Sequence, residues 1–411
     1  MLLDGKPVLL LCSNNYLGLA DHPRLREAAA EAAMRWGVGT GASRLVSGTM
    51  TIHRRLEERL AEFKGRQAAL LFGSGYLANA GTIAALARPG DVVFSDELNH
   101  ASIIDGCRLS RAEVFVYEHA DVEHLRWGIV HAEGRGALIV TDSVFSMDGD
   151  VAPLVEIVDL AQHFGLRTVV DEAHATGTLG PGGRGAVAEA GLEDHVDVVV
   201  GTLGKALGSY GAFVACDQEM AHYLVNAART FIFSTALPPS AVAGALAALD
   251  LISERPRLVA KLAANATALR LGLQQEGFEV GASRTQILPL VIGEAQQAMR
   301  ICEAALAGGV FAQAIRPPTV PDMTSRLRLA VMATHREEEL RAAARTLGAA
   351  ARSVGFDPRS APREVALTLS EPDFDDEFDD AFEADDESVA LPAPRAGVFD
   401  FEAPEPVRRA A

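Results

Sequence analysis

The chain has 411 residues, of which 49% are hydrophobic and 22% charged, and its formal net charge is -18. This length suffices for two or three domains with buried cores, and the acidic charge excludes non-specific binding to nucleic acid, which needs a basic surface. No apolar run approaches the roughly 18 residues of a membrane helix, and the four cysteines form no C-x-x-C pair, so we expect a cytoplasmic protein without a disulfide framework or a thiolate zinc site.

Short apolar runs alternate with helical patterns over the first 240 residues. A run at 8–12 predicts a first strand, and further strands are predicted at 69–72, 92–94, 114–117, 137–141, 168–170, 196–200 and 212–215. Between two of these runs, Leu154, Ile157, Val158 and Ala161 have the i, i+3, i+4, i+7 spacing of an amphipathic helix. The alternation predicts an α/β fold with a doubly wound, mainly parallel sheet that helices cover on both faces.

A second block follows Pro238 and Pro239. An alanine-rich helical stretch leads into an apolar run at 287–292, a helix near 295–307 and a further run at 326–329. We therefore expect an N-terminal segment at 1–37, a large domain at 38–240, a smaller α+β domain at 241–355 and an acidic tail at 356–411. Residues 371–388 hold 11 acids and no base. This composition predicts a disordered, solvated segment, with a helix that folds on a partner as the alternative.

A lysine and an aspartate follow two of the predicted strands. Lys205 lies in a glycine turn after the run at 196–200, and Asp171 ends the run at 168–170. Ligands of such sheets bind at the carboxyl ends of the strands. A lysine in a glycine turn beside a carboxylate is what an enzyme that uses pyridoxal 5'-phosphate (PLP) needs, because the lysine binds the cofactor covalently and the carboxylate keeps its ring nitrogen protonated.

A glycine turn and two histidines fall at the same predicted edge. Residues 73–76 join a strand to a helix, and such a turn exposes backbone N–H groups that suit the cofactor phosphate, although plain chain reversal is the alternative. His100 and His174 also follow apolar runs, where one is expected to stack on a planar cofactor and the other to bond its ring oxygen. His53 and His163 are predicted to lie on helix surfaces. No H-E-x-x-H or similar cluster occurs, so no metal is expected.

An ATPase was the competing class for these motifs. Residues 171–174 spell the acidic box of a helicase, and Gly204 with Lys205 resembles the end of a P-loop. Val199 stands where the first P-loop glycine belongs, and Ala206 replaces the hydroxyl residue that binds magnesium. The helicase interpretation is therefore rejected.

Six segments in chain order resemble the α-oxoamine synthases, which are fold-type I PLP-dependent transferases of the aspartate aminotransferase type. They are 13–19, 39–48, 142–150, the Asp171 box, the Lys205 turn and 315–321, and the likeness covers about residues 8–350. It implies a homodimer that condenses an amino acid with an acyl thioester and releases carbon dioxide. The segment 314–321 is most similar to members that use L-alanine and a pimeloyl thioester, carried by CoA or an acyl carrier protein. Glycine-using members, an aminotransferase or lyase, and a non-catalytic partner subunit are the alternatives.

The resemblance also implies residue roles. Lys205 is expected to bind PLP and then to remove the substrate Cα proton, Asp171 to pair with the ring nitrogen, and His100 to stack on the ring. The other implied cofactor-binding residues are Gly75, Tyr76, Ser146, His174 and Thr202, with Ser234 and Thr235 supplied across the dimer. The implied substrate-binding residues are Asn14, His100, Thr319 and Arg328, of which Arg328 takes the amino-acid carboxylate.

The sequence departs from this family at both ends. Members carry a few tens of further residues before the position of Met1, including an arginine that binds the acyl substrate. We expect either an upstream start or a replacement of that contact by Arg44 or Arg316. The acidic tail is not needed by the family and is expected to change little.

Overall fold

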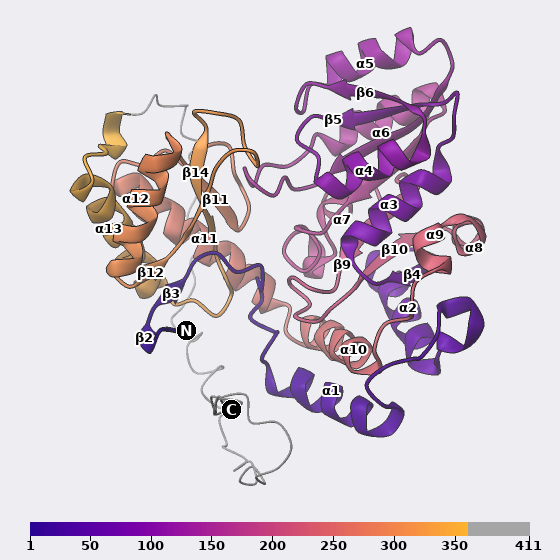
Figure 1. Ribbon diagram of the computed structural model, residues 1–411, viewed down its shortest axis with the longest axis horizontal. Coiled ribbons are helices and arrows are strands. Elements are labelled where there is room, and N and C mark those ends of the chain that lie inside the picture. Colours follow the sequence, from indigo (N-terminus) through magenta and orange to yellow (C-terminus); the bar gives the residue numbers. More distant parts are fainter. Residues whose placement is uncertain (361–411) are drawn as a thin grey trace, which may run out of the picture. The chain divides into compact units, whose positions relative to one another are not determined.

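The structure is a computed structural model that describes residues 1–360 (Figure 1). The acidic segment 371–388, for which disorder was predicted, lies outside the described residues. Within residues 1–360, no helix is both long enough and apolar enough to cross a membrane.

A seven-stranded sheet forms the centre of a large lobe and has the order β4-β10-β9-β8-β7-β5-β6. Its strands are β4 (Ala68–Phe72), β5 (Val92–Asp96), β6 (Glu113–Tyr117), β7 (Gly136–Asp142), β8 (Arg167–Asp171), β9 (Val198–Thr202) and β10 (Ala212–Cys216). All neighbouring strands are parallel except β10, which is antiparallel to both β4 and β9. The predicted α/β class with a mainly parallel sheet is confirmed.

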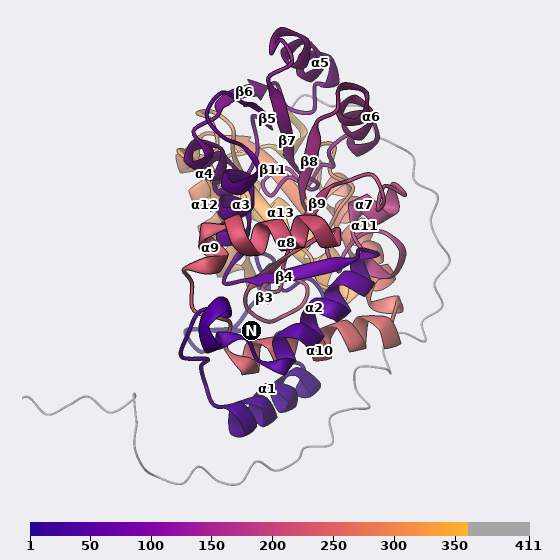
Figure 2. The same cartoon turned by 90° about the vertical axis from the view of Figure 1, so that its right-hand side faces the viewer.

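Alternate side chains of these strands enter two separate hydrophobic clusters, one on each face of the sheet. On β8, for example, Val169 belongs to one cluster and Val170 to the other. Figure 2 shows α3 and α4 on one side of the sheet and α6 on the other. The helices of this lobe are α1 (Pro23–Trp36), η1 (Arg44–Gly48), α2 (Thr51–Lys64), α3 (Gly75–Leu86), α4 (Ala101–Ser110), α5 (Val122–His131), α6 (Leu154–Phe164), η2 (Pro181–Gly183), α7 (Ala186–Glu189), α8 (Gln218–Ala227), α9 (Arg229–Ile232) and α10 (Pro239–Glu254).

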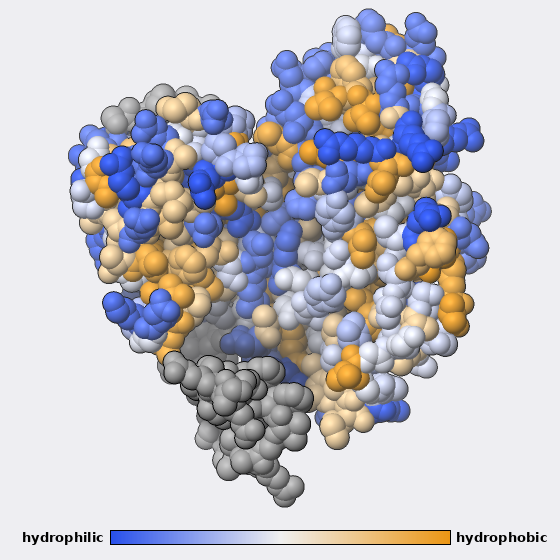
Figure 3. Space-filling model, viewed as in Figure 1, coloured by the Kyte–Doolittle hydropathy of each residue, from blue (hydrophilic) through white to orange (hydrophobic). Residues whose placement is uncertain are grey.

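A small lobe contains an antiparallel sheet of order β11-β14-β13. Its elements are α11 (Arg257–Gln275), β11 (Ile287–Gly293), α12 (Ala295–Ala307), β12 (Val310–Phe311), β13 (Gln313–Ile315), β14 (Ser325–Ala330), α13 (Glu337–Ser353) and η3 (Pro358–Ser360). The N-terminal hairpin of β1 (Leu2–Leu3) and β2 (Lys6–Pro7) precedes β3 (Leu9–Leu10), which pairs in parallel with β12. The chain therefore starts against the small lobe and crosses to α1 (Figure 1). Figure 3 shows hydrophilic surface in the hollow between the two lobes.

One prediction about a helix surface is wrong. His53 lies on α2 but is fully buried, with its Nε2 2.9 Å from the carbonyl oxygen of Leu237 and its Nδ1 accepting from the backbone N–H of Met50. Helix α10 packs against α2, and the loop that leads into α10 covers a face that the local pattern marks as solvent-exposed. His163 on α6 is exposed, as predicted.

Candidate active site

The predicted active-site lysine lies at the carboxyl edge of the seven-stranded sheet. Lys205 belongs to a turn between β9 and β10 in which the N–H of Ser209 donates to the carbonyl of Leu203 at 2.8 Å. Gly208 closes this turn at φ +59°, and a Cβ there would meet the backbone of Ala20 at 2.6 Å. A glycine is therefore required for the turn that presents Lys205.

A chain of hydrogen bonds joins Lys205 to the N-terminal segment. Its Nζ lies 2.8 Å from Nε2 of His174, whose Nδ1 lies 2.6 Å from the hydroxyl of Tyr16. That hydroxyl donates to Oδ1 of Asn14 at 3.0 Å. When Lys205 is protonated, its ammonium group can only donate, so Nε2 of His174 accepts from it and Nδ1 donates to Tyr16. The chain thus has one direction, from the lysine to Asn14.

Arg328 reaches the same chain from β14 in the small lobe. Its Nη2 donates to Oδ1 of Asn14 at 3.2 Å and to the Tyr16 hydroxyl at 3.4 Å, and its Nε donates to the carbonyl oxygen of Ser146 at 2.5 Å. Arg328 is 7% exposed, and these neutral acceptors hold its guanidinium in place. It remains a cation without a carboxylate among these partners, which suits a substrate carboxylate.

Asp171 is the last residue of β8 and is 4% exposed. Its carboxylate accepts from Nδ2 of Asn79 at 2.5 Å and from the backbone N–H of Ala173 at 2.7 Å. The same Nδ2 donates to the hydroxyl of Ser102, which lies 2.7 Å from Nδ1 of His100. A buried carboxylate whose hydrogen-bond partners are neutral amides is suited to a cationic N–H group in the site.

Burial shifts the proton equilibria of the cluster. It lowers the pKa of Lys205 to about 8, although Asp171 and Asp142 oppose the shift. Burial, followed by the charge of Lys205, keeps the pKa of His174 well below its usual value, so this imidazole is neutral. Burial and the nearby Asp171 raise the pKa of Asp142, whose Oδ2 accepts from the backbone N–H of His100 at 2.7 Å. The site therefore holds a lysine that is partly neutral near pH 7.

The start of α3 lies at the same edge of the sheet. Ser74 caps the helix by accepting from the N–H of Leu77 at 3.2 Å, and a Cβ on Gly75 would meet no atom within 4 Å. The space beside Gly75 is therefore open, and the helix N-terminus formed by Gly75 and Tyr76 makes it favourable for an anion. Thr202 ends β9 nearby in the sheet and donates to the carbonyl of Gly211 at 3.2 Å.

These residues fit PLP at three points. The Asp171 carboxylate suits a protonated ring nitrogen, the start of α3 suits a phosphate, and the amine of Lys205 suits covalent attachment of an aldehyde. His100 caps α4 by accepting from the N–H of Ser102 at 3.2 Å, and partial burial of its ring lowers its pKa. No group of three or more potential metal ligands occurs in residues 1–360.

The structure does not join every predicted residue to this cluster. Thr319 is exposed on the loop before β14, and Ser234 and Thr235 lie beside η1, where Thr235 pairs with Ser43 in a β-bridge. Within residues 1–360, no hydrogen bond connects these three residues to Lys205 or Asp171. The prediction for Ser234 and Thr235 concerns a neighbouring subunit and so is not tested within one chain.

Of the two arginines expected to contact an acyl substrate, Arg44 is already engaged. Its guanidinium forms two hydrogen bonds with Glu57, at 2.7 and 2.9 Å, and its side chain is 8% exposed. Arg316 is exposed beside a hollow of about 290 Å³ that it lines with Arg300. Arg316 is therefore the better placed of the two for a solvent-borne anion.

Sequence reasoning missed three residues that shape the site. Tyr16 and Asn79 hold His174 and Asp171, and Gln286 donates from its Nε2 to the carbonyl oxygen of His174 at 2.9 Å. Asn79 carried a usable signal, since it is a polar residue within the apolar stretch 77–84 of a predicted helix. Tyr16 lies in the resembling segment 13–19, but neither Tyr16 nor Gln286 carried a signal for these contacts, because their partners lie more than 100 residues away.

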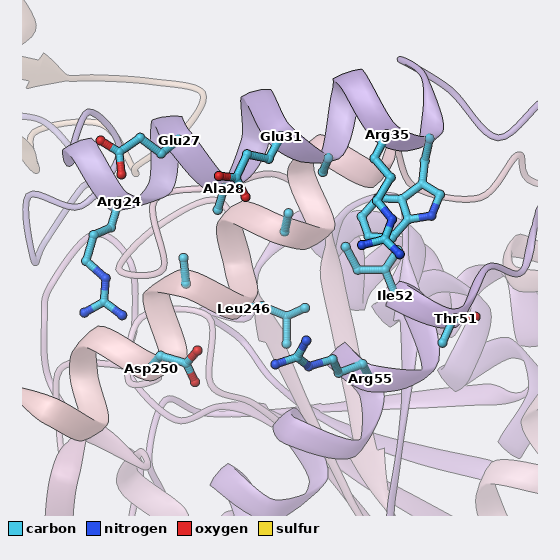
Figure 4. Close-up of a pocket in the computed structure, with 14 residues that line it drawn as sticks. Arg24, Glu27, Ala28, Glu31, Arg35, Thr51, Ile52, Arg55, Leu246 and Asp250 are labelled. Carbon is cyan, nitrogen blue, oxygen red and sulfur yellow. The ribbon is translucent and has the colours of Figure 1, made fainter.

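A second hollow of about 630 Å³ lies between α1, α2 and α10 (Figure 4). Arg24 and Asp250 project into it from opposite helices, and Ile52 and Leu246 form part of its apolar wall. Its lining contains no lysine, histidine or cysteine. This hollow therefore offers no counterpart to the Lys205 cluster.

Comparisons with known proteins agree with these features. The model of the aminotransferase class I and II family matches residues 6–347. The 8-amino-7-oxononanoate synthase of Geobacter metallireducens is 54% identical over 356 residues, which cover 86% of this chain and 91% of that protein. A serine palmitoyltransferase from S. paucimobilis, solved with a bound PLP–myriocin aldimine, has a TM-score of 0.83 at 36% identity and covers 86% of this chain and 89% of its own. The 8-amino-7-oxononanoate synthase of Francisella tularensis has a TM-score of 0.73 at 26% identity, with 84% and 98% covered.

Proposed function

The chain belongs to the class I and II aminotransferase family, and on that premise we propose that it catalyses the reaction for which its most similar curated relatives are named. In this PLP-dependent acyl transfer, L-alanine condenses with a pimeloyl thioester, carbon dioxide and the thiol leave, and 8-amino-7-oxononanoate forms for biotin biosynthesis. The observation that carries the proposal is the 54% identity to such a synthase over 86% of the chain, in a site whose lysine and aspartate fit the cofactor.

When bound, PLP supplies an electron sink for the charge left on the alanine Cα after its proton departs. We assign removal of that proton to Lys205, because a pKa near 8 provides neutral amine at physiological pH. Asp171 holds the proton on the ring nitrogen, and Arg328 binds the alanine carboxylate. The hydrogen bonds of Arg328 to Asn14 and Ser146 orient its guanidinium before the substrate arrives.

The remaining residues are assigned to holding the cofactor and the acyl chain. His100 would stack on the ring, and His174 and Ser146 would lie beside the ring oxygen. The phosphate-binding set is Gly75, Tyr76 and Thr202, with Ser234 and Thr235 of the partner subunit. Asn14 and Thr319 line the substrate cleft. The support for these roles is the contact of His174 with Lys205, the hydrogen bond of Arg328 to the carbonyl of Ser146, and the open space at Gly75.

We also propose that the protein is a homodimer in the cytoplasm and that each chain has four parts. The parts are the segment 1–37, the PLP-binding domain 38–240, the small domain 241–355 and the tail 356–411. Exposed apolar side chains of Leu45, Val46 and Phe233 favour a second copy at this surface, because monomers rarely leave such groups uncovered together. The Ser43–Thr235 bridge places them on adjoining segments. The cysteines Cys12, Cys107, Cys216 and Cys302 are all unpaired, as cytoplasmic thiols are.

One matrix of assays tests the proposal. Purified protein with PLP is offered L-alanine, glycine or L-serine, each with pimeloyl-CoA, a pimeloyl carrier protein or acetyl-CoA, and a Lys205→Ala variant serves as the matched inactive control. We expect product from L-alanine and a pimeloyl donor. Turnover of glycine with acetyl-CoA instead would assign the activity of 2-amino-3-ketobutyrate CoA ligase, the alternative from the sequence. L-serine is included because of the structural likeness to serine palmitoyltransferase.

A further inference from the structure

The loop at 143–151 connects β7 to α6 and carries Ser146. It folds back on itself through a bridge between Val144 and Val151 and through the N–H of Gly149, which donates to the carbonyl of Phe145 at 2.8 Å. The tip of the loop supplies the carbonyl of Ser146 that accepts from Nε of Arg328. The orientation of Arg328 therefore depends on the position of this loop.

Two cations hold this loop through two of its carboxylates. Arg326, from β14, forms an ion pair with Asp148. His119, which follows β6, has its Nε2 2.8 Å from Oδ2 of Asp150 and its Nδ1 3.0 Å from Oδ1 of Asp96 at the end of β5. The central sheet and the small lobe thus each anchor one end of the loop tip.

His119 must carry a positive charge to make both contacts. Carboxylate oxygens only accept hydrogen bonds, so both ring nitrogens have to donate, and only the imidazolium has two N–H groups. Burial opposes this charge, but the hydrogen bonds to Asp150 and Asp96 outweigh burial and raise the pKa of His119 to about 10. Asp148 adds a further negative charge nearby, and the ring of Phe145 packs edge-on at 4.4 Å.

We propose that His119 is a positioning residue: held as an imidazolium between Asp96 and Asp150, it fixes the 143–151 loop and, through the carbonyl of Ser146, aligns Arg328 with the substrate carboxylate. The inference rests on the proposed function for the role of Arg328. It assigns to a histidine outside the cofactor site a specific effect on amino-acid binding. The acyl substrate, which Arg328 is not assigned to bind, should be unaffected.

The test uses the holoenzyme and follows L-alanine binding by the absorbance change of the cofactor, without an acyl donor. In His119→Asn one amide replaces two N–H donors, so Asp150 loses its cationic partner. We expect the Kd for L-alanine to rise about 10- to 150-fold, the range for one misaligned charge-assisted contact, while the KM for the acyl substrate changes less than about twofold. The double variant His119→Asn/Asp150→Asn should recover affinity, because two amides can pair.

His163→Asn is the matched control, since His163 is an exposed histidine on α6; its Kd should equal that of the wild type. An unchanged Kd in His119→Asn, or an equal rise in both substrates, overturns the proposal. If His119→Asn fails to fold, Asp150→Asn replaces it with the same expectation. Nitrogen-15 NMR of the labelled holoenzyme decides the charge independently of any turnover. Two protonated ring nitrogens at pH 8 support the proposal, and an ordinary histidine titration overturns it even if the proposed condensation is absent.

Discussion

At the scale of single residues, the pKa of Lys205 has a consequence for cofactor attachment. Burial lowers that pKa to about 8, whereas an exposed lysine has a pKa of about 10.4. Only the neutral amine attacks an aldehyde, so the rate of PLP attachment to the cofactor-free protein should rise about tenfold from pH 7 to pH 9 and then level. Stopped-flow absorbance measures this rate. Nα-acetyl-lysine under the same buffers is the control, and its rate should still be rising at pH 9.

Asp171 should act through its charge. Asp171→Asn keeps the size and can keep the contact with the backbone N–H of Ala173, but a neutral amide does not stabilise a protonated ring nitrogen. PLP should bind while turnover falls roughly 10²–10⁴-fold, as for the loss of an acid–base group. Cofactor absorbance and initial rates measure the two effects. Near-normal turnover in this variant would remove the role assigned to Asp171.

The sequence indicated where Lys205, Asp171 and His174 would lie better than it indicated the residues that contact them. Lys205, Asp171 and His174 each end or follow an apolar run, and a parallel sheet brings such positions to one edge. Tyr16 supports His174 from 158 residues away. The local sequence pattern does not encode such a contact, because the contact depends on how the segment between β3 and α1 crosses between the lobes. The prediction for His53 was wrong for the same reason, because a loop that is distant in the sequence covers this side chain.

At the scale of elements, the ion pair between Lys64 and Glu172 ties α2 to the turn that follows Asp171. Lys64 donates to Glu172 at 2.5 Å, to Thr176 at 2.8 Å and to the carbonyl of Arg184 at 2.7 Å, and both charged side chains are almost fully buried. Removing one partner leaves an uncompensated buried charge. Lys64→Met should therefore cost about 3–5 kcal/mol of unfolding free energy.

A double variant separates this charge effect from lost packing. Glu172→Gln keeps an oxygen that can accept from the N–H of Val187, as Glu172 does at 2.7 Å. In Lys64→Met/Glu172→Gln no buried charge remains, so most of the lost stability should return. Urea unfolding of the wild type, both single variants and the double variant closes the cycle. Additive losses would show that the pair is not coupled.

The loop at 143–151 gives a pH-dependent element. The pKa of His119 is about 10 in the folded protein, against about 6.5 for an unperturbed histidine. Its contribution to stability is therefore complete below about pH 6.5 and is lost as the pH rises through 10. Stability should therefore fall from pH 7 to pH 10 more steeply in the wild type than in His119→Asn. Urea midpoints across this range measure the difference. Parallel pH profiles would contradict the assigned charge.

Element types were predicted more reliably than their partners. The predicted runs at 92–94 and 168–170 lie inside β5 and β8, because strands buried on both faces are continuously apolar. The run at 212–215 could not reveal that β10 is antiparallel, since direction depends on the connection before it. The strand predicted at 8–12 is only two residues long as β3, because its partner β12 is equally short.

At the scale of the whole molecule, the exposed apolar side chains at 45–46 and 233 predict a second copy of the chain. Val46 is 79% exposed and Phe233 is 70% exposed. Val46→Glu would place a charge in the proposed interface, where burial without a partner is costly. We expect this variant to be monomeric by light scattering, with an unchanged far-ultraviolet circular dichroism spectrum. A wild type that is itself monomeric would contradict the proposed dimer.

Shared active sites follow if Ser234 and Thr235 of the partner subunit contact the cofactor phosphate. Thr235 is exposed and its contact with Ser43 is a backbone bridge, so Thr235→Asp should leave the fold intact while its carboxylate repels the phosphate of the neighbouring site. Lys205→Ala instead removes the cofactor-binding lysine, which the other subunit contributes to that site. Each homodimer should be inactive, because both of its sites carry the change.

A heterodimer of the two chains, purified with two affinity tags, combines both defects in one site and leaves the other site complete. It should therefore have about half the wild-type activity, as expected for one working site in a two-fold dimer. If each site were built from one chain, both sites of the heterodimer would be defective and no activity would appear.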